Sequence, residues 1–378
     1  MSLENIAGIA KEPTVFTPTY PAVSTAVVTE LLPLLNEDVR QERDQESVID
    51  RASDSDSFAT RLLTLGVSVR GGFAITLSYR GIETLLACAL GHQAYRLDGN
   101  VQPEDVDSGV AFRHVFEMET DLDKTDWLAG DGFIAGTDGL IAGSQKVRRI
   151  TYAVNKGPNV WAAKSGYFGA LSLGFSPQGP SAEANLVFHS ISTNDANNAA
   201  ISLLSCDHER IVFQDVECYF TPSTNIDPED PGNLVNIVGI NLELDNALSV
   251  IHSRHSGLTI EEPRRGAAAV LSGTMAIPRY STNTLIDAAY GDVPSRLLIV
   301  ATGPIIPGTT TNYQLRIHLP NIQFTGADVP VDGPDQTSQS YSFVALSTDE
   351  TVGLPPTSRK GPMVIELIND NNTHTLFP

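Results

Sequence analysis

A strand followed at once by a short helix is the feature that most constrains this chain, and it lies between Val69 and Tyr95. Apolar residues alternate with small or polar residues from Phe73 to Tyr79, which is the period of a half-buried strand. Gly81 interrupts this pattern, and from Ile82 to Ala89 the apolar residues recur at helical spacing. The segment therefore predicts a strand, a tight turn and a helix, with Gly91 as a left-handed C-terminal cap.

The same order of elements returns in the second half of the chain, between Leu271 and Val300. We interpret the two segments as an internal repeat of a unit built mostly of strands with one short helix. The counterparts in the second segment are Met275 and Ile277 in the strand, Ser281 or Thr282 at the N-cap, Thr284–Tyr290 in the helix and Gly291 at its C-terminal end.

Turn-forming residues are spread along the whole chain, with 30 glycines and 23 prolines among 378 residues. They separate short alternating runs, as in all-β proteins, and an apolar content of 41% is enough to build two cores. We expect a mainly β fold with two β-sandwich or barrel domains by internal duplication, each with a short flanking α-helix. The expected divisions are an N-terminal acidic arm at 1–60, a first domain at 61–212 and a second domain at 213–378.

Other alternating runs predict further strands in both halves. They are Phe112–Met118, a hairpin within Gln145–Phe168 that turns at Gly157–Pro158, two short strands within Leu234–Val250, Tyr313–Leu319 ending before Pro320, Tyr341–Leu346 and Met363–Ile368.

The arm at 1–60 is distinguished by its charge. Glu37–Asp56 contains eight acidic residues and three arginines, with almost no apolar residues between them. One interpretation is a solvated surface loop that is partly extended or mobile, and the other is an arm that lies on an adjacent subunit.

The overall charge limits the function classes that fit. A net charge of −21 argues against a protein whose affinity depends on neutralising phosphates. Three cysteines, Cys88, Cys206 and Cys218, favour a reducing compartment without a disulfide framework. We see neither a signal peptide nor a run of eighteen apolar residues, so we expect a soluble chain made in a cytosol and no membrane contact.

Several motifs resemble chemical sites, but each is better explained as structure. The glycines of 130–143 have the wrong spacing for a dinucleotide loop and no helix follows them, so a turn-rich connection is favoured. No zinc or calcium pattern is complete, and no nucleophile elbow is present. We therefore expect no enzymatic activity, no cofactor and no metal. The residues considered for metal ligation or stacking were Cys206, His208, Cys218, His252, His255, Asp121, Asp123, Asp126, Trp127 and Trp161.

Between about residues 60 and 370 the sequence resembles the tail tube (major tail) proteins of long, non-contractile bacteriophage tails, in their two-domain form. The resemblance is a pattern of small, apolar and turn residues. The segments that carry it are GFAITLSYRGIETLLACALGHQAY, FRHVFEMETDL, QKVRRITYAVNKGPNVWAAKSGYFGAL, NIVGINLELDNALSVIH, SGLTIEEP, NYQLRIHLPNIQF and SYSFVAL.

This resemblance implies a structural virion protein that assembles in the host cytoplasm into stacked rings. Hairpins of successive domains would join into a closed barrel around a lumen, through which DNA passes without specific binding during ejection. Trimeric rings with pseudo-sixfold symmetry are implied by two domains per chain, with hexameric rings as the other possibility. Other tail proteins would contact the ends of the tube.

Two hairpins are our candidates for lumen or inter-subunit strands, Gln145–Phe168 in the first half and Leu234–Thr259 in the second. An acidic lumen would repel the DNA backbone, which fits the net charge. The alternatives are another tail component, such as a tail-tip, head-tail joining or decoration protein, and a carbohydrate-binding β-sandwich.

Overall fold

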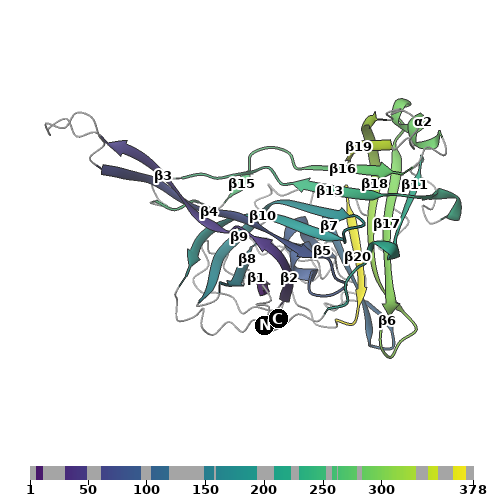
Figure 1. The fold of residues 1–378 in the computed structure, drawn as a ribbon, viewed down its shortest axis with the longest axis horizontal. Coiled ribbons are helices and arrows are strands. Elements are labelled where there is room, and N and C mark those ends of the chain that lie inside the picture. Colours follow the sequence, from purple (N-terminus) through teal and green to yellow (C-terminus); the bar gives the residue numbers. More distant parts are fainter. Residues whose placement is uncertain are drawn as a thin grey trace, which may run out of the picture.

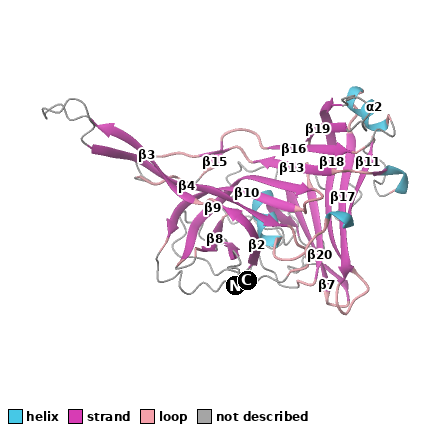
Figure 2. Ribbon diagram, viewed as in Figure 1, coloured by secondary structure: helices cyan, strands magenta, loops and turns pink. Residues whose placement is uncertain are grey.

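The computed structural model describes residues 6–11, 30–48, 61–94, 104–118, 149–156, 159–193, 208–222, 230–252, 258–261, 263–278, 283–328, 339–347 and 361–371. Strands dominate these residues and only two α-helices occur among them, so the expected mainly β fold is confirmed (Figure 2). Eighteen of the described strands form one antiparallel sheet, and β14 (Leu248–Ser249) and β15 (Arg264–Arg265) form a separate pair.

Six strands of the first half form a closed ring of backbone pairings. The ring runs β1, β2, β4, β10, β9 and β8, and β8 pairs with β1 again. Buried side chains of these strands pack together, and the rings of Phe73 and Tyr152 stack with centroids 4.8 Å apart. Closure leaves no edge open along the paired stretches. The strands are β1 (Ile6–Lys11), β2 (Glu30–Glu37), β4 (Arg61–Thr76), β8 (Ile150–Asn155), β9 (Val160–Phe175) and β10 (Ser181–Ser192).

The second half repeats this strand order. β13 pairs with β16, β16 with β19, β19 with β18, β18 with β17, and β17 with β11. β11 pairs in turn with β12, which leads into β13. The two helices also hold equivalent places, because α1 follows β4 and α2 follows β16. These strands are β11 (Val216–Thr221), β12 (Leu234–Val235), β13 (Gly239–Asp245), β16 (Val270–Ile277), β17 (Ser295–Ile305), β18 (Asn312–Asp328) and β19 (Gln339–Ala345).

The repeat inferred from the sequence thus has a counterpart in the topology of the sheet. The divisions after residues 60 and 212 stay predictions. β1 and β2, which belong to the segment expected as an acidic arm, take part in the first ring.

Two pairings join the halves into one sheet. β9 pairs with β13, and the C-terminal strand β20 (Val364–Asn369) lies between β18 of the second half and β7 (Ala111–Met118) of the first. β7 also pairs with the short strands β5 (Gly91–Ala94) and β6 (Glu104–Asp107). Short 3-10 turns at Phe213–Asp215 and Pro231–Asn233 flank β11 and β12.

Both predicted helices are confirmed, and so is the position of Gly291 at the end of the second, but the other predicted caps are wrong. α1 (Glu83–Leu90) is buried along its whole length, and α2 (Thr284–Tyr290) buries Leu285 and Ala288. Gly91 does not cap α1, because it begins strand β5. The N-cap of α2 is Asn283 in place of Ser281 or Thr282, and its side chain makes no capping hydrogen bond; Gly291 is the C-cap, but it is right-handed with φ −84°. The ends of these helices depend on strand pairing and tertiary packing, which local capping rules do not take into account.

Strand β18 continues past the point where the sequence predicts its end. Pro320 lies within the strand, where the pairing with β17 shifts register between Leu319 and Ile322. Such an irregularity tolerates proline, because a bulged residue need not donate to the ladder.

A two-stranded ribbon projects from the body of the molecule (Figure 1). It consists of β3 (Arg40–Val48) and the first part of β4, paired from Arg70 to Arg61. Gly71 marks its base with φ +142°, and a Cβ atom at this position would lie 2.6 Å from the Cα of Val39. Only glycine fits this backbone and this close approach. The base is further held by a hydrogen bond from Gly72 N–H to the Asp38 carboxylate.

Candidate functional site: a polar sheet face shared by both halves

Seven strands present one continuous face to solvent, and we call it the polar face. In spatial order they are β4, β10, β9, β13, β16, β19 and β18. Successive side chains of a strand point to opposite sides, so the apolar residues of these strands, such as Leu173, Leu242 and Met275, are buried in the core. Apart from Val270 and Val344, the outward residues are small, hydroxyl, amide or acidic, and they are exposed or half-buried.

The register aligns the outward residues in rows that cross the seven strands. One row is Ala74, Glu183, Ser172, Glu243, Ser272, Val344 and Gln323. The next is Thr76, Ser181, Gly174, Asn241, Thr274, Ser342 and Gly326. A third contains Asn185, Ala170, Asp245 and Val270.

Acidic side chains are the charges on the polar face. Glu183, Glu243, Asp245 and Asp328 are exposed, and the strand segments that form the face (72–76, 170–174, 181–185, 239–245, 270–276, 323–328 and 340–344) contain no lysine or arginine. The next outward residue of β4 beyond Gly72 is the exposed Arg70. Glu183 and Glu243 are separated by one strand, which places their strands about 10 Å apart. At that spacing salt screens most of their mutual repulsion, whereas a polyanion that approaches the whole face meets a field of one sign.

The seam between the halves is a regular ladder of six residue pairs, from Ile240 opposite Phe175 to Asp245 opposite Ala170. The Ser172 hydroxyl donates to Asn241 Oδ1 across the seam at 2.9 Å. Beyond its end, the buried Asn246 amide donates to the carbonyls of Phe168 at 3.1 Å and Ala89 at 3.3 Å. The seam is therefore fixed to α1 as well as to β9.

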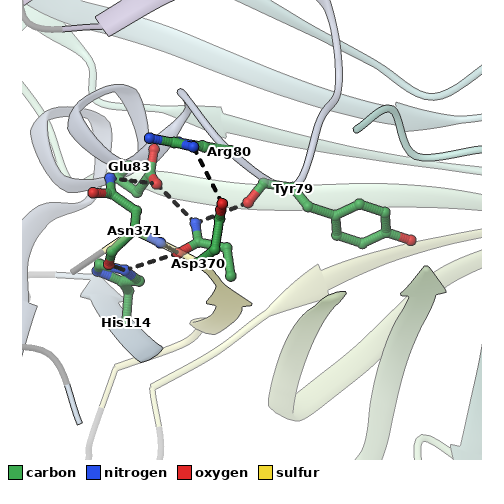
Figure 3. A network of polar contacts seen from close by, with 7 residues as sticks. Tyr79, Arg80, Glu83, His114, Asp370 and Asn371 are labelled. Atoms are coloured by element: carbon green, nitrogen blue, oxygen red, sulfur yellow. Dashed lines mark hydrogen bonds and ion pairs between the residues drawn. The ribbon is translucent and has the colours of Figure 1, made fainter. Parts of the chain in front are cut away.

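A second polar feature is buried where the C-terminal strand meets the first half (Figure 3). We call it the Glu83 network, and it consists of Tyr79, Arg80, Glu83, His114, Asn369, Asp370 and Asn371. The fully buried Glu83 accepts at Oε1 from the side-chain amides of Asn369 at 2.8 Å and Asn371 at 3.0 Å. Asn369 also donates to the Tyr79 carbonyl at 2.9 Å, while the Tyr79 ring points away from the network.

His114 is the titratable base of this network. Its Nε2 lies 3.2 Å from Asn369 Oδ1 and 3.1 Å from the Asn371 carbonyl, and Nδ1 has no hydrogen-bond partner. Burial lowers the pKa of His114 below its ordinary value, an effect that the negative Glu83 opposes. At the edge of the network, Arg80 forms an ion pair of 3.3 Å with Asp370.

Only part of the two hairpins predicted to line the lumen belongs to the polar face. The second, Leu234–Thr259, contributes β13 to the seam. In the first, Gln145–Phe168, the β8 residues Ile150–Val154 are buried and offer no exposed face. The first-half strands of the face are instead the end of β9, β10 and the end of β4. Strand alternation was visible in the sequence at these segments, but the seam between β9 and β13 depends on a long-range register.

The motifs weighed for chemistry do not converge in the described part of the chain. Cys88 and Cys218 are buried and belong to no disulfide, and the His208 ring lies against Gly81. Among the described residues, no three His, Cys, Asp or Glu side chains are grouped as a metal site would require. Half-buried Trp161 lies under Lys156, whose Nζ is 5.1 Å from the ring centroid. Cys206, His255, the glycines of 130–143, Asp121, Asp123, Asp126 and Trp127 lie outside the described residues.

The Glu83 network had no clear signal in the sequence. The run Asn369-Asp370-Asn371 would ordinarily be assigned to a turn, and Glu83 to the solvent side of a helix. Neither of the described helices is long and apolar enough to cross a membrane.

Comparisons with known proteins add a weak structural likeness. No protein-family model and no curated protein matches the chain. Among solved structures, the tail tube of SPP1, determined by solid-state NMR and cryo-electron microscopy, aligns over 43% of this chain and 81% of its own, with 12% identity and a TM-score of 0.27. A TM-score of this size does not establish a shared fold.

Proposed function

We propose that this chain is a structural virion protein that assembles into stacked rings to form a tail tube, with the polar face lining the channel for DNA. The observation that carries this proposal is the continuity of the face. It crosses seven strands and both halves, and the strand segments that form it contain no lysine or arginine. The assembled tail would be made in the host cytoplasm.

The chemistry of the face suits a conduit better than a binding site. Strong DNA binding needs lysine or arginine at the phosphates, and the face carries carboxylates instead. Single-stranded nucleic acid is held by stacking on aromatic rings, and the outward rows contain no Phe, Tyr or Trp. DNA would therefore move along short hydroxyl and amide side chains without being retained.

Open strand edges provide a route to self-assembly. β3 pairs only with β4 among the described strands, and β18 from Gln323 to Asp328 pairs only with β19. Joining one copy to the next at such edges would cover them and extend the polar face into a closed wall. Because each chain carries two equivalent strand units, a trimer would give a ring with pseudo-sixfold symmetry, and a hexamer is the second possibility.

The projecting ribbon exposes several leucine side chains to solvent. A two-stranded hairpin is marginally stable alone in water, yet Leu62, Leu63 and Leu65 are 64%, 48% and 47% exposed on it. We take the ribbon to be an arm that lies on an adjacent subunit, which would bury these leucines.

Charge reversal on the polar face tests the conduit. Virions carrying Glu183→Lys with Glu243→Lys are expected to release DNA more slowly in an in vitro ejection assay, because each chain then offers two cations to the phosphates. The matched control, Glu183→Gln with Glu243→Gln, removes the charges without adding cations and is expected to eject at close to the normal rate. Tail length and shape, seen by electron microscopy, verify assembly in both variants.

If the lysine variant forms normal tails and ejects DNA at the normal rate, the polar face does not line the lumen. Thiol labelling then checks the geometry directly. Ser172→Cys should lose its reaction with a bulky maleimide upon tube formation, whereas Tyr290→Cys on α2, at 76% exposure in the wild-type residue, should keep it. Equal labelling of both sites in tubes would contradict the proposal.

Another tail component is the second candidate, as a tail-tip, head-tail joining or decoration protein. Quantitative gels of virions separate the two, because a tube protein is present as many rings and a joining protein as one. A carbohydrate-binding β-sandwich is tested by glycan-array binding.

A further inference from the structure

The C-terminal strand β20 connects two parts of the sheet, because it pairs with β18 on one side and with β7 on the other. On one side it pairs with β18 from Val364 opposite His318 to Ile368 opposite Gln314. On the other it pairs with β7 along its whole length, and among the described strands β7 has no pairing with the second half other than β20. The position of β20 therefore sets where β7 lies against β18, together with the contacts that Thr310 and Thr311 make with Asp107 at the end of β6.

The Glu83 network holds the end of β20, and its hydrogen-bond directions can be assigned from its own contacts. Asn369 directs its amide at two acceptors, Glu83 Oε1 and the Tyr79 carbonyl, so its Oδ1 faces donors. One of those donors is the Asn371 backbone N–H at 3.0 Å. The other must be His114 Nε2, which also reaches the Asn371 carbonyl. Nε2 therefore carries a proton, and in the neutral form of His114 the lone pair is on Nδ1.

Four buried side-chain atoms of the network residues have no hydrogen bond: His114 Nδ1, Glu83 Oε2, Asp370 Oδ1 and the Tyr79 hydroxyl. A second proton on the imidazole would sit at Nδ1, where no acceptor faces it in the closed arrangement. The nearest source of compensation is the Glu83 carboxylate, but its Oε1 already accepts from Asn369 and Asn371.

We propose that the Glu83 network is a proton-operated latch, which holds the C-terminal strand β20 between the halves when His114 is neutral and loosens it when His114 is protonated. The latch belongs to the single chain and does not depend on tube formation. It gives the protein a second arrangement in which the edges of β7 and β18 become available for pairing.

The other charged groups around His114 do not replace Glu83 as its partner. Arg80 is engaged by Asp370 at the rim. On β7 and its neighbours, Arg113 pairs with Glu104 on the opposite face of the strand, and Asp105 accepts from Gly109 N–H. On β20 and β18, Glu366 lies on the opposite face, near Arg316. The Tyr79 ring points away from His114 and stacks on Tyr313, and the pKa values of both phenols are raised.

The direction of the pH effect follows from the environment of the histidine. Because burial lowers its pKa in the closed state, the opened segment binds the proton more readily than the closed one. The equilibrium constant for opening is therefore independent of pH above the ordinary histidine pKa, and it increases as the pH falls below that pKa. With one proton linked, the opening equilibrium rises by up to about tenfold for each pH unit until the folded pKa is reached.

Hydrogen exchange of the full, unassembled chain tests the latch. Protection factors of the β20 amides, corrected for intrinsic exchange, are expected to fall by up to about tenfold between roughly pH 6.5 and 5.5, and to be constant above that range. The amides of β13, which lie far along the sheet, serve as the internal reference and should not change. His114→Gln keeps an amide donor in place of Nε2 and cannot titrate, so its β20 protection should be independent of pH.

Unchanged protection of β20 in the wild-type chain across this range would overturn the proposal. A loss of β20 protection in His114→Gln as large as that of the wild-type chain would overturn it too. If that variant does not fold, the comparison of β20 with β13 in the wild-type chain decides alone. A parallel loss in both strands signals general acid unfolding and counts against a latch.

Discussion

The contact between Gly273 and Phe343 allows a quantitative test of how the second half is packed. Gly273 on β16 pairs with Phe343 on β19, and the buried ring covers the glycine. A Cβ atom at Gly273 would lie 2.3 Å from the ring and 3.0 Å from the Asn241 carbonyl oxygen. Carbon atoms in contact prefer about 3.5 Å or more, so the ring would have to retreat by about 1.2 Å. Gly273→Ala should therefore destabilise the protein, although alanine normally suits a strand better than glycine.

We expect Gly273→Ala to cost about 2–3 kcal/mol, the upper part of the usual range for overpacking, because the carbonyl on the other side cannot yield. Gly326→Ala is the matched control, since that glycine lies in the same sheet with no atom within 4 Å of the added Cβ. It should change stability by about 0.5 kcal/mol or less. Urea unfolding of the unassembled chain, followed by circular dichroism, measures both.

A double substitution separates the steric clash from other effects. Phe343→Leu alone removes buried volume and should cost about 1–3 kcal/mol. In the Gly273→Ala background it also makes room for the new methyl group. The stability loss of the double variant should therefore be smaller than the sum of the two single losses, by at least about 1 kcal/mol. Strictly additive losses, or a neutral Gly273→Ala, would refute the packing described for this pair.

Three further predictions concern the ribbon, a loop contact and a thiol. Gly71→Ala should destabilise the chain by about 1–3 kcal/mol in the same assay, because it places a side chain at φ +142° against Val39; a neutral effect would contradict the assigned backbone. The Asp107 carboxylate has a lowered pKa, chiefly because it accepts from the Thr310 backbone N–H at 2.8 Å. This contact should persist above the ordinary aspartate pKa and be lost as the pH falls through the lowered value; an unperturbed Thr310 amide resonance in Asp107→Ala at neutral pH would argue against it. Burial raises the pKa of Cys218 to about 12, so iodoacetamide at pH 8 should label this thiol only after unfolding, as read by mass spectrometry; rapid labelling of the native chain would contradict its burial.

Local periodicity predicted both helices and several strands of each half, but not β1, β2 and β10, which complete the first ring. The switch from period two to helical spacing at Ile82 placed α1 to within a residue, and the alternation at 112–118 and 363–368 placed β7 and β20. These signals are local, because they reflect which side chains face the core. The same patterns could not predict that Gly91 enters a strand, since that depends on its pairing with Met118.

The polar face and the Glu83 network depend on partners far apart in the sequence. Ser172 and Asn241 meet because two strands pair in one register, and a shift by one residue would turn Glu243 toward the core. Asn369 meets Glu83 across almost the whole chain. Composition did suggest an acidic surface, but it could not place the carboxylates in rows, because rows exist only after the sheet is formed.

The seam between β9 and β13 has a mechanical consequence. Its ladder of six pairs has no flexible joint, so the two strand units of one chain form a single stiff plate. If such plates are stacked into a tube, curvature must be taken up where one copy meets the next. The compliance of the whole filament would then be set by the contacts made by the projecting ribbons, and lengthening or shortening a ribbon would change how far the filament bends without altering its bore.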